Sequence, residues 1–135
     1  MRKFIKIGRA LDPNIPLDNL ISVLVTLSDP AFQNRIWLKC EGPEVDSFDE
    51  ALFSLDDMVV YFKYQIREKE ISIDSKCIRE VLRTHAMCNT FVRKLDDLNF
   101  PDDWQGWHRS LFCDPYWSKI REQAQYAWSL LELGK

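Results

Sequence analysis

The sequence is short of glycine and histidine, and these shortages exclude several kinds of active site. The four glycines stand alone, at Gly8, Gly42, Gly106 and Gly134. A phosphate-binding loop needs clustered glycines, because only then do its backbone amides approach the anion. The two histidines, His85 and His108, do not form the H-E-x-x-H motif of zinc proteases, and no stretch repeats acidic ligands around a glycine as a calcium loop does. We therefore expect neither a cofactor nor a metal ion.

Long apolar runs and Cys-x-x-Cys pairs are also missing. The most hydrophobic window, residues 20–27, is too short to span a bilayer, and the basic N-terminus lacks the apolar run of a secretory signal. The four cysteines are Cys40, Cys77, Cys88 and Cys113. Cys77 and Cys88 would lie about 16 Å apart on one helix, whereas a disulfide needs Cα atoms within about 7 Å. We expect a cytoplasmic protein with free thiols and no membrane contact.

What the sequence does contain is typical of one soluble domain built from helices. The chain has 135 residues, 46% of them hydrophobic and 29% charged, which indicates a single domain over residues 1–135. Apolar residues from Leu17 to Val25 follow helical spacing. The pair Asp29-Pro30 predicts the start of a second, short helix that reaches about Cys40. A third helix begins at Ser47, which with Glu50 forms an S-x-x-E capping box, and ends at about Arg67.

Apolar stripes support three long helices. The helix after Ser47 carries Phe48, Leu52, Leu55, Val59, Phe62 and Ile66. A helix from Asp74 is expected to bury Ile78, Val81, Leu82, His85, Cys88, Val92 and Leu95. A last helix from Asp114-Pro115 carries Trp117, Ile120, Ala124, Trp128 and Leu131. With a further short helix after Asp102 or Asp103, the prediction is an all-α domain of five to six helices. The alternative is an α+β fold with a hairpin around residues 59–73, where β-branched and aromatic residues are common.

One pair of side chains suggests a nucleophile. His85 and Cys88 lie one helical turn apart, and an imidazole can activate a neighbouring thiolate. Both fall on the stripe expected to face the core, where a lone histidine is more often a structural residue than a catalytic one. We therefore expect that the protein is not an enzyme.

Acidic residues are concentrated in blocks. Residues 41–62 hold seven carboxylates and no lysine or arginine, and residues 95–104 hold four more. In the first block Asp46 precedes a stripe of Glu50, Phe53, Asp57, Tyr61 and Tyr64, which is turned away from the core stripe. In the second block, acids and aromatics are again neighbours, at Asp102, Asp103, Trp104 and Trp107. Carboxylates around exposed aromatics suit the binding of a basic protein, because aromatics anchor an interface and charges accelerate encounter.

Other interpretations of the charges stay open. Acids in a first helical turn favour the helix dipole, and the acidic block could be a solvated face. The cations Lys76, Arg79 and Arg83 could neutralise the acids if the two long helices pack as a hairpin. The same cations could instead contact nucleic-acid phosphates in a small regulator. The flanking acidic blocks would repel a polyanion, so we expect no direct nucleic-acid binding.

In size, charge and the character of the segments "DSFDEALFSLDD" and "DDLNFPDDWQGW", the chain resembles the immunity proteins that neutralise bacterial toxins, those of contact-dependent growth inhibition systems in particular. The resemblance implies non-covalent capture of a cognate toxin, often a basic nuclease, with carboxylates in place of substrate phosphates. The alternative function is that of a structural or adaptor subunit of a larger complex. We expect a monomer or a weak dimer that folds without metal.

Overall fold

The computed structural model describes residues 14–41, 47–96 and 111–134, and the regular structure in these ranges is helical. The elements are α1 (Asn14–Ser28), α2 (Pro30–Phe32), the π-helix η2 (Gln33–Leu38), α3 (Phe48–Arg67), α4 (Ser75–Asp96) and α6 (Pro115–Leu133). The all-α prediction is confirmed. The alternative hairpin around residues 59–73 is wrong, because α3 continues through Arg67 and a seven-residue connection, 68–74, leads directly into α4. The 3.6-residue apolar period outweighs the local β propensity there.

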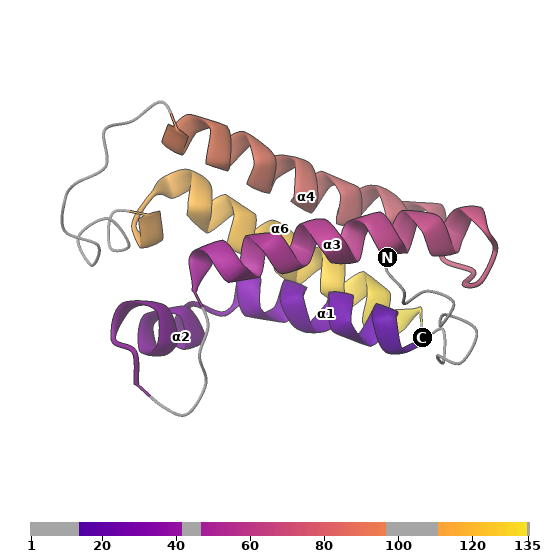
Figure 1. Ribbon diagram of the computed structural model, residues 1–135, viewed down its shortest axis with the longest axis horizontal. Coiled ribbons are helices and arrows are strands. Elements are labelled where there is room, and N and C mark those ends of the chain that lie inside the picture. Colours follow the sequence, from indigo (N-terminus) through magenta and orange to yellow (C-terminus); the bar gives the residue numbers. More distant parts are fainter. Residues whose placement is uncertain (1–13, 42–46, 97–110, 135) are drawn as a thin grey trace.

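The four long helices form an antiparallel bundle (Figure 1). Helix α1 packs against α3 and α6, and α4 packs against the same two helices. Successive long helices run in opposite directions, so every neighbouring pair is antiparallel. The short elements α2 and η2 lie at the end of the bundle where α1 stops and α3 starts. This is the up-down-up-down arrangement of four-helix bundles, with the α2–η2 segment inserted into its first connection.

Four of the helix starts that the sequence predicts are closed by side-chain caps. In each, an oxygen of the residue before the helix accepts a hydrogen bond from a backbone N–H of the first turn, which would otherwise have no intrahelical partner. The pairs are Asp29 Oδ1 with Phe32 N (3.1 Å), Ser47 Oγ with Glu50 N (3.2 Å), Asp74 Oδ1 with Lys76 N (2.7 Å) and Asp114 Oδ1 with Tyr116 N (2.8 Å). Proline follows Asp29 and Asp114, where its fixed φ suits the first helical position.

The long helices share one hydrophobic core. The predicted stripes of α3 and α6 are buried or half-buried, but the buried face of α4 is turned relative to the prediction. Among the described members of its predicted stripe only Val81 and Cys88 are fully buried, and Ile78, Leu82, His85 and Val92 are half-buried. The residues that fill the rest of this face are Cys77, Glu80, Thr84 and Phe91. Because α4 packs against α6 as well as α3, its buried face is wider than one stripe. Leu95 lies outside the described side chains.

The predicted short helix before residue 40 is one turn of α-helix followed by the π-helix. Gln33 opens the π-helix and is fully buried. Its amide nitrogen donates to the carbonyls of Thr26 and Leu27 at 2.9 and 2.8 Å, which lie in the last turn of α1. Its amide oxygen accepts from the indole Nε1 of Trp117 at 3.1 Å. One side chain therefore closes α1, anchors the π-helix and joins both to α6.

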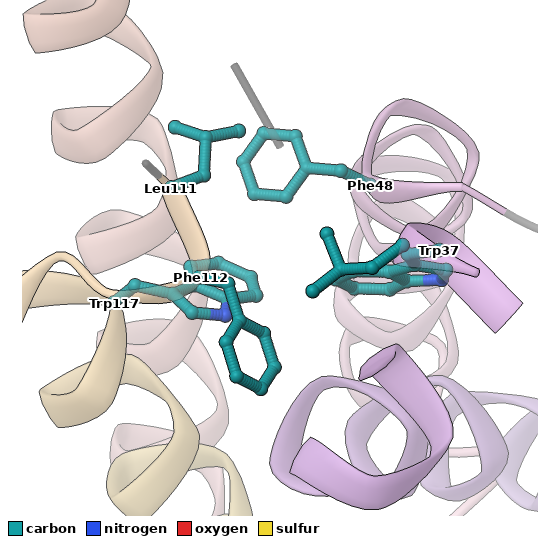
Figure 2. Close-up of a pocket in the computed structure, with 6 residues that line it drawn as sticks. Trp37, Phe48, Leu111, Phe112 and Trp117 are labelled. Atoms are coloured by element: carbon teal, nitrogen blue, oxygen red, sulfur yellow. The ribbon is translucent and has the colours of Figure 1, made fainter. Parts of the chain in front are cut away.

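Aromatic side chains from distant parts of the sequence meet next to Trp117, the partner of this glutamine. Figure 2 shows three of them, Trp37, Phe48 and Trp117, around one small hollow. Trp37 of the π-helix, Phe48 of α3 and Trp117 of α6 contact one another, with ring centroids 4.9 to 6.1 Å apart. Phe91 of α4 adds an edge contact to Phe48 at 6.0 Å and a stacked contact to Trp117 at 5.5 Å. Aromatic pairs of this kind add stabilisation beyond the area that they bury. The cluster therefore packs η2, α3, α4 and α6 together at one end of the bundle.

Candidate partner-binding surface on α3

The solvent-facing side of α3 carries large apolar side chains among acids. Phe53 and Val60 are 73% and 68% exposed, and Tyr64 is 40% exposed. They follow one another at steps of seven and four residues, so they lie along one line of the helix. Four carboxylates of the first three turns are also exposed, those of Asp49, Glu50, Asp56 and Asp57. We call the line from Glu50 through Phe53, Asp57, Val60 and Tyr64 to Arg67 the α3 seam.

Three of the four acids of this surface make no ion pair with the described residues of α4. Within residues 14–41, 47–96 and 111–134, the carboxylates of Asp49, Glu50 and Asp57 make no ion pair. Among the described residues, the α4 cations Lys76, Arg79 and Arg83 do not pair with these three carboxylates, so the alternative of neutralisation across a hairpin is not supported. Arg79 approaches its neighbour Glu80 at 3.8 Å, and the Lys76 ammonium lies over the ring of Tyr126 at 5.7 Å. The negative charge at the start of α3 is therefore available to an external cation.

Asp56 is the one acid of this group with a partner across the helix boundary. Its Oδ1 lies 2.5 Å from Nε2 of His85 on α4. The histidine side chain is 19% exposed and the aspartate 55% exposed, so the contact lies at the rim between the two helices. This contact shows that the side of α3 bearing Asp56 faces α4. The other acids, Glu50 and Asp57, lie further around α3 toward the solvent.

The second half of the surface is ordered by stacking. The rings of Tyr61 and Tyr64 are parallel to within 16°, with centroids 5.8 Å apart. The Arg67 guanidinium lies 5.4 Å above the Tyr64 ring, and its Nε donates to Glu68 at 3.3 Å. Burial, followed by the charge of Glu70 and by Tyr64, raises the pKa of Tyr61, so its hydroxyl stays protonated. Rings held in this way lose little conformational entropy when a partner covers them.

The structure brings together five of the predicted site residues, namely Glu50, Phe53, Asp57, Tyr61 and Tyr64. The other five, Asp46, Asp102, Asp103, Trp104 and Trp107, lie outside the described residues, as does the short helix predicted after Asp102 or Asp103. Sequence reasoning missed Val60, the second most exposed of the apolar residues on α3. Val60 lies seven residues after Phe53, and this spacing predicts that the two share one side of the helix. The apolar run "MVVYF" made the spacing difficult to recognise, because all its residues are apolar or aromatic.

The pair His85 and Cys88 does not form a nucleophile–base arrangement. His85 is directed to Asp56, and the thiol of Cys88 is 2% exposed. Burial, with a smaller contribution from the charge of Asp56, raises the pKa of Cys88 to about 12. The thiolate that a nucleophile requires is therefore disfavoured at neutral pH. Cys77 is also buried, and its thiol donates to the carbonyl of Leu130 at 3.5 Å.

Two of the hollows lined by described residues have no histidine or cysteine in their described lining. The smaller, about 10 Å³, lies within the aromatic cluster and holds at most about one water molecule (Figure 2). The larger, about 550 Å³ and open to solvent, lies at the opposite end of the bundle. Its described lining contains no histidine, cysteine or cation, and consists of Leu17, Asp18, Glu70, Ile71, Ser72, Ile73 and Gly134.

In the part of the chain that the structure covers, no three His, Cys, Asp or Glu side chains gather in an arrangement that could hold a metal ion. None of the described helices combines the length and the apolar character needed to cross a membrane. Comparison of the chain with protein families, with curated proteins and with solved structures gives no match.

Proposed function

We propose that this protein binds a basic protein partner through the exposed side of α3 and neutralises it, in the manner of a toxin immunity protein. The supporting observation is the combination on one helix of exposed Phe53 and Val60 with the carboxylates of Glu50 and Asp57, which no described cation pairs. Large apolar side chains exposed to water cost free energy unless a partner covers them.

The surface suits capture better than catalysis. A convex helix surface offers a partner contact area but no enclosed space for a small substrate, and ligand sites are usually concave. The apolar line provides the part of an interface from which water is excluded, and the acids provide a charged rim. A basic toxin domain, such as a nuclease that binds phosphates, would present the complementary positive surface.

Co-expression with a toxin encoded beside this protein tests the proposal. The wild-type protein should restore growth, and Asp57→Lys and Phe53→Ala should each reduce the protection. Two changes elsewhere serve as matched controls, Glu122→Lys for the charge reversal and Leu133→Ala for the apolar truncation, since both residues are exposed on α6. These controls should protect as well as the wild type does.

The result that overturns the proposal is equally concrete. If the two α3 variants fold normally and protect fully, the exposed side of α3 does not neutralise the toxin. If purified protein binds, through the same residues, a partner without toxic activity, the protein is an adaptor subunit instead.

A further inference from the structure

The α3 seam has the spacing of a helix-pairing surface. Its members follow one another at alternating steps of three and four residues, which is the spacing of the a and d positions of a coiled coil. All six side chains are exposed, Tyr64 to 40%, while the opposite side of α3 is buried in the bundle core. The helix therefore carries one apolar face that the bundle covers and a second, exposed line on which the apolar residues Phe53, Val60 and Tyr64 alternate with charged ones.

The seam is also complementary to itself when its direction is reversed. Its first half is acidic, with Glu50 and Asp57, and its last residue is the cation Arg67. Beside the seam, Asp56 lies in the first half and Lys63 in the second. A second, antiparallel copy of α3 would meet opposite charge at both ends.

We propose that two copies of this protein associate through antiparallel packing of their α3 seams about a two-fold axis between Asp57 and Val60. In this register Glu50 faces Arg67 of the second copy, and Phe53 faces Tyr64 of the second copy. Asp57 lies beside Val60 of the second copy, and Asp56 flanks Lys63 of the second copy. The two Asp57 carboxylates approach each other across the axis, and this like-charge contact weakens the association. A two-fold axis generates each contact twice, so the same patch serves both chains.

Contacts within the chain prepare the seam for this packing. The Arg67 guanidinium rests on the Tyr64 ring at 5.4 Å and uses its Nε for Glu68, so its terminal nitrogens stay available as donors. Tyr61 supports Tyr64 from the side by stacking. Phe53 and Tyr64 are thus the anchors of the interface. The Phe53 ring is exposed, and the Tyr64 ring is held in place by Tyr61 and Arg67.

The dimer is expected to be weak. One exposed helix face buries less area than a standard stable interface, and Asp57 places a carboxylate in the seam. We expect a dissociation constant on the order of 100 µM, which corresponds to a small free energy of association. The dimer covers the surface assigned above to the partner, so the two associations exclude each other. The dimer rests on the same surface as the proposed function but does not depend on it.

Sedimentation velocity over a range of concentrations at low salt tests the charge pairing. Glu50→Arg and Arg67→Glu should each raise the dissociation constant about tenfold, because each change turns two attractive contacts per dimer into repulsive ones. The double variant Glu50→Arg/Arg67→Glu should recover the wild-type value, because the pairs re-form with the signs exchanged. Arg83→Glu, an exposed charge on α4, is the matched control and should leave association unchanged.

Cysteine cross-linking tests the antiparallel register. In a background with the exposed Cys40 and Cys113 changed to serine, Phe53→Cys and Tyr64→Cys are made as separate variants. Identical positions would lie about 16 Å apart along the antiparallel pair, beyond disulfide reach, so neither variant should cross-link alone. A mixture of the two should form a disulfide-linked heterodimer. A wild-type protein that stays monomeric to about 1 mM, a double variant that does not recover, or single variants that cross-link with themselves would each overturn the proposal.

Discussion

Gln33 and Trp117, 84 residues apart in the chain, are joined by a buried hydrogen bond of 3.1 Å between the glutamine Oε1 and the indole Nε1. The same glutamine donates to two carbonyls at the end of α1. Three helices thus depend on one amide group. This fully buried polar side chain is tolerated because both its amide nitrogen and its amide oxygen have hydrogen-bond partners.

Replacing Gln33 should therefore be costly. Gln33→Leu keeps much of the volume but removes the hydrogen-bond partner of the Trp117 indole N–H and of the Leu27 carbonyl, whereas the Thr26 carbonyl keeps the N–H of Asp29 at 3.4 Å. Each unsatisfied buried group costs about 1–3 kcal/mol. We expect the free energy of unfolding to fall by about 3 kcal/mol, measured by urea denaturation. Gln125→Leu, at an exposed position of α6, is the control and should change it by less than about 0.5 kcal/mol. A similar loss in both variants would show that the bonds do not stabilise the fold.

The two faces of α3 should respond differently to truncation. Leu55 has no exposure, and Leu55→Ala should cost about 2–5 kcal/mol because it leaves a cavity in the core. Val60 is 68% exposed, and Val60→Ala should leave the free energy of unfolding within about 0.5 kcal/mol of wild type. Thermal unfolding of both variants checks this. A large loss of stability in Val60→Ala would mean that this residue is packed within the monomer.

The four thiols should fall into two kinetic classes. Cys40 and Cys113 are exposed, whereas Cys77 and Cys88 are buried. At pH 8 a thiol reagent should modify the first pair rapidly and the second pair only on unfolding, since burial both blocks access and raises the pKa of Cys88 to about 12. Single Cys→Ser variants assign each phase. Rapid modification of Cys88 in the folded protein would contradict its burial.

The raised pKa of Cys88 also predicts the alkaline behaviour of the protein. The folded state holds the thiol proton more tightly than the unfolded chain, whose cysteine has the ordinary value of 9.0. The stability from this group is present in full below about pH 9 and is lost as pH rises toward 12. The slope is about 1.4 kcal/mol per pH unit. The fall in unfolding free energy between pH 8 and pH 10 should be smaller for Cys88→Ala than for the wild type. Equal falls in the two proteins would contradict the raised pKa of Cys88 in the folded state.

Binding kinetics should separate the roles of the acids and the aromatics on α3. Against the true partner, Asp57→Lys should slow association and weaken its dependence on salt, since rim charges act mainly on encounter. Phe53→Ala should instead speed dissociation, by a factor corresponding to about 2 kcal/mol if the ring is covered at the interface. Surface plasmon resonance at two salt concentrations measures both the association and the dissociation rate constants. Unchanged rate constants in both variants would leave the acidic side of α3 as a solvated surface.

Local signals in the sequence were sufficient for the helix starts and for most of the core. Ser47, Asp29-Pro30 and Asp114-Pro115 mark helix starts through bonds to the next few residues, so their effect can be predicted without the fold. The π-helix at Gln33 could not be predicted in this way. Its opening residue is held by the end of α1 and by Trp117, and no local pattern encodes partners that distant.

The same difference between local signals and distant contacts explains which parts of the candidate site could be predicted from the sequence. The periodicity of α3 placed Glu50, Phe53 and Asp57 on the outer side because a helix fixes its faces locally. The pairing of Asp56 with His85 depends on how α3 and α4 pack, which the sequence pattern does not specify. The buried face of α4 was assigned a single stripe for a similar reason, since contact with two neighbouring helices widens the face that is buried.

The arrangement of the four long helices has a consequence for how the chain can be reconnected. The start of α1, the connection between α3 and α4 and the end of α6 lie at one end of the bundle (Figure 1). Leu17, Ile71 and Gly134 border the same hollow. A circular permutant opened within residues 68–74, with the end of α6 connected to the start of α1 by a linker, would preserve the direction of every long helix. Its new ends would emerge at the end of the bundle opposite the aromatic cluster. The order of the helices along the chain is therefore separable from their arrangement in space.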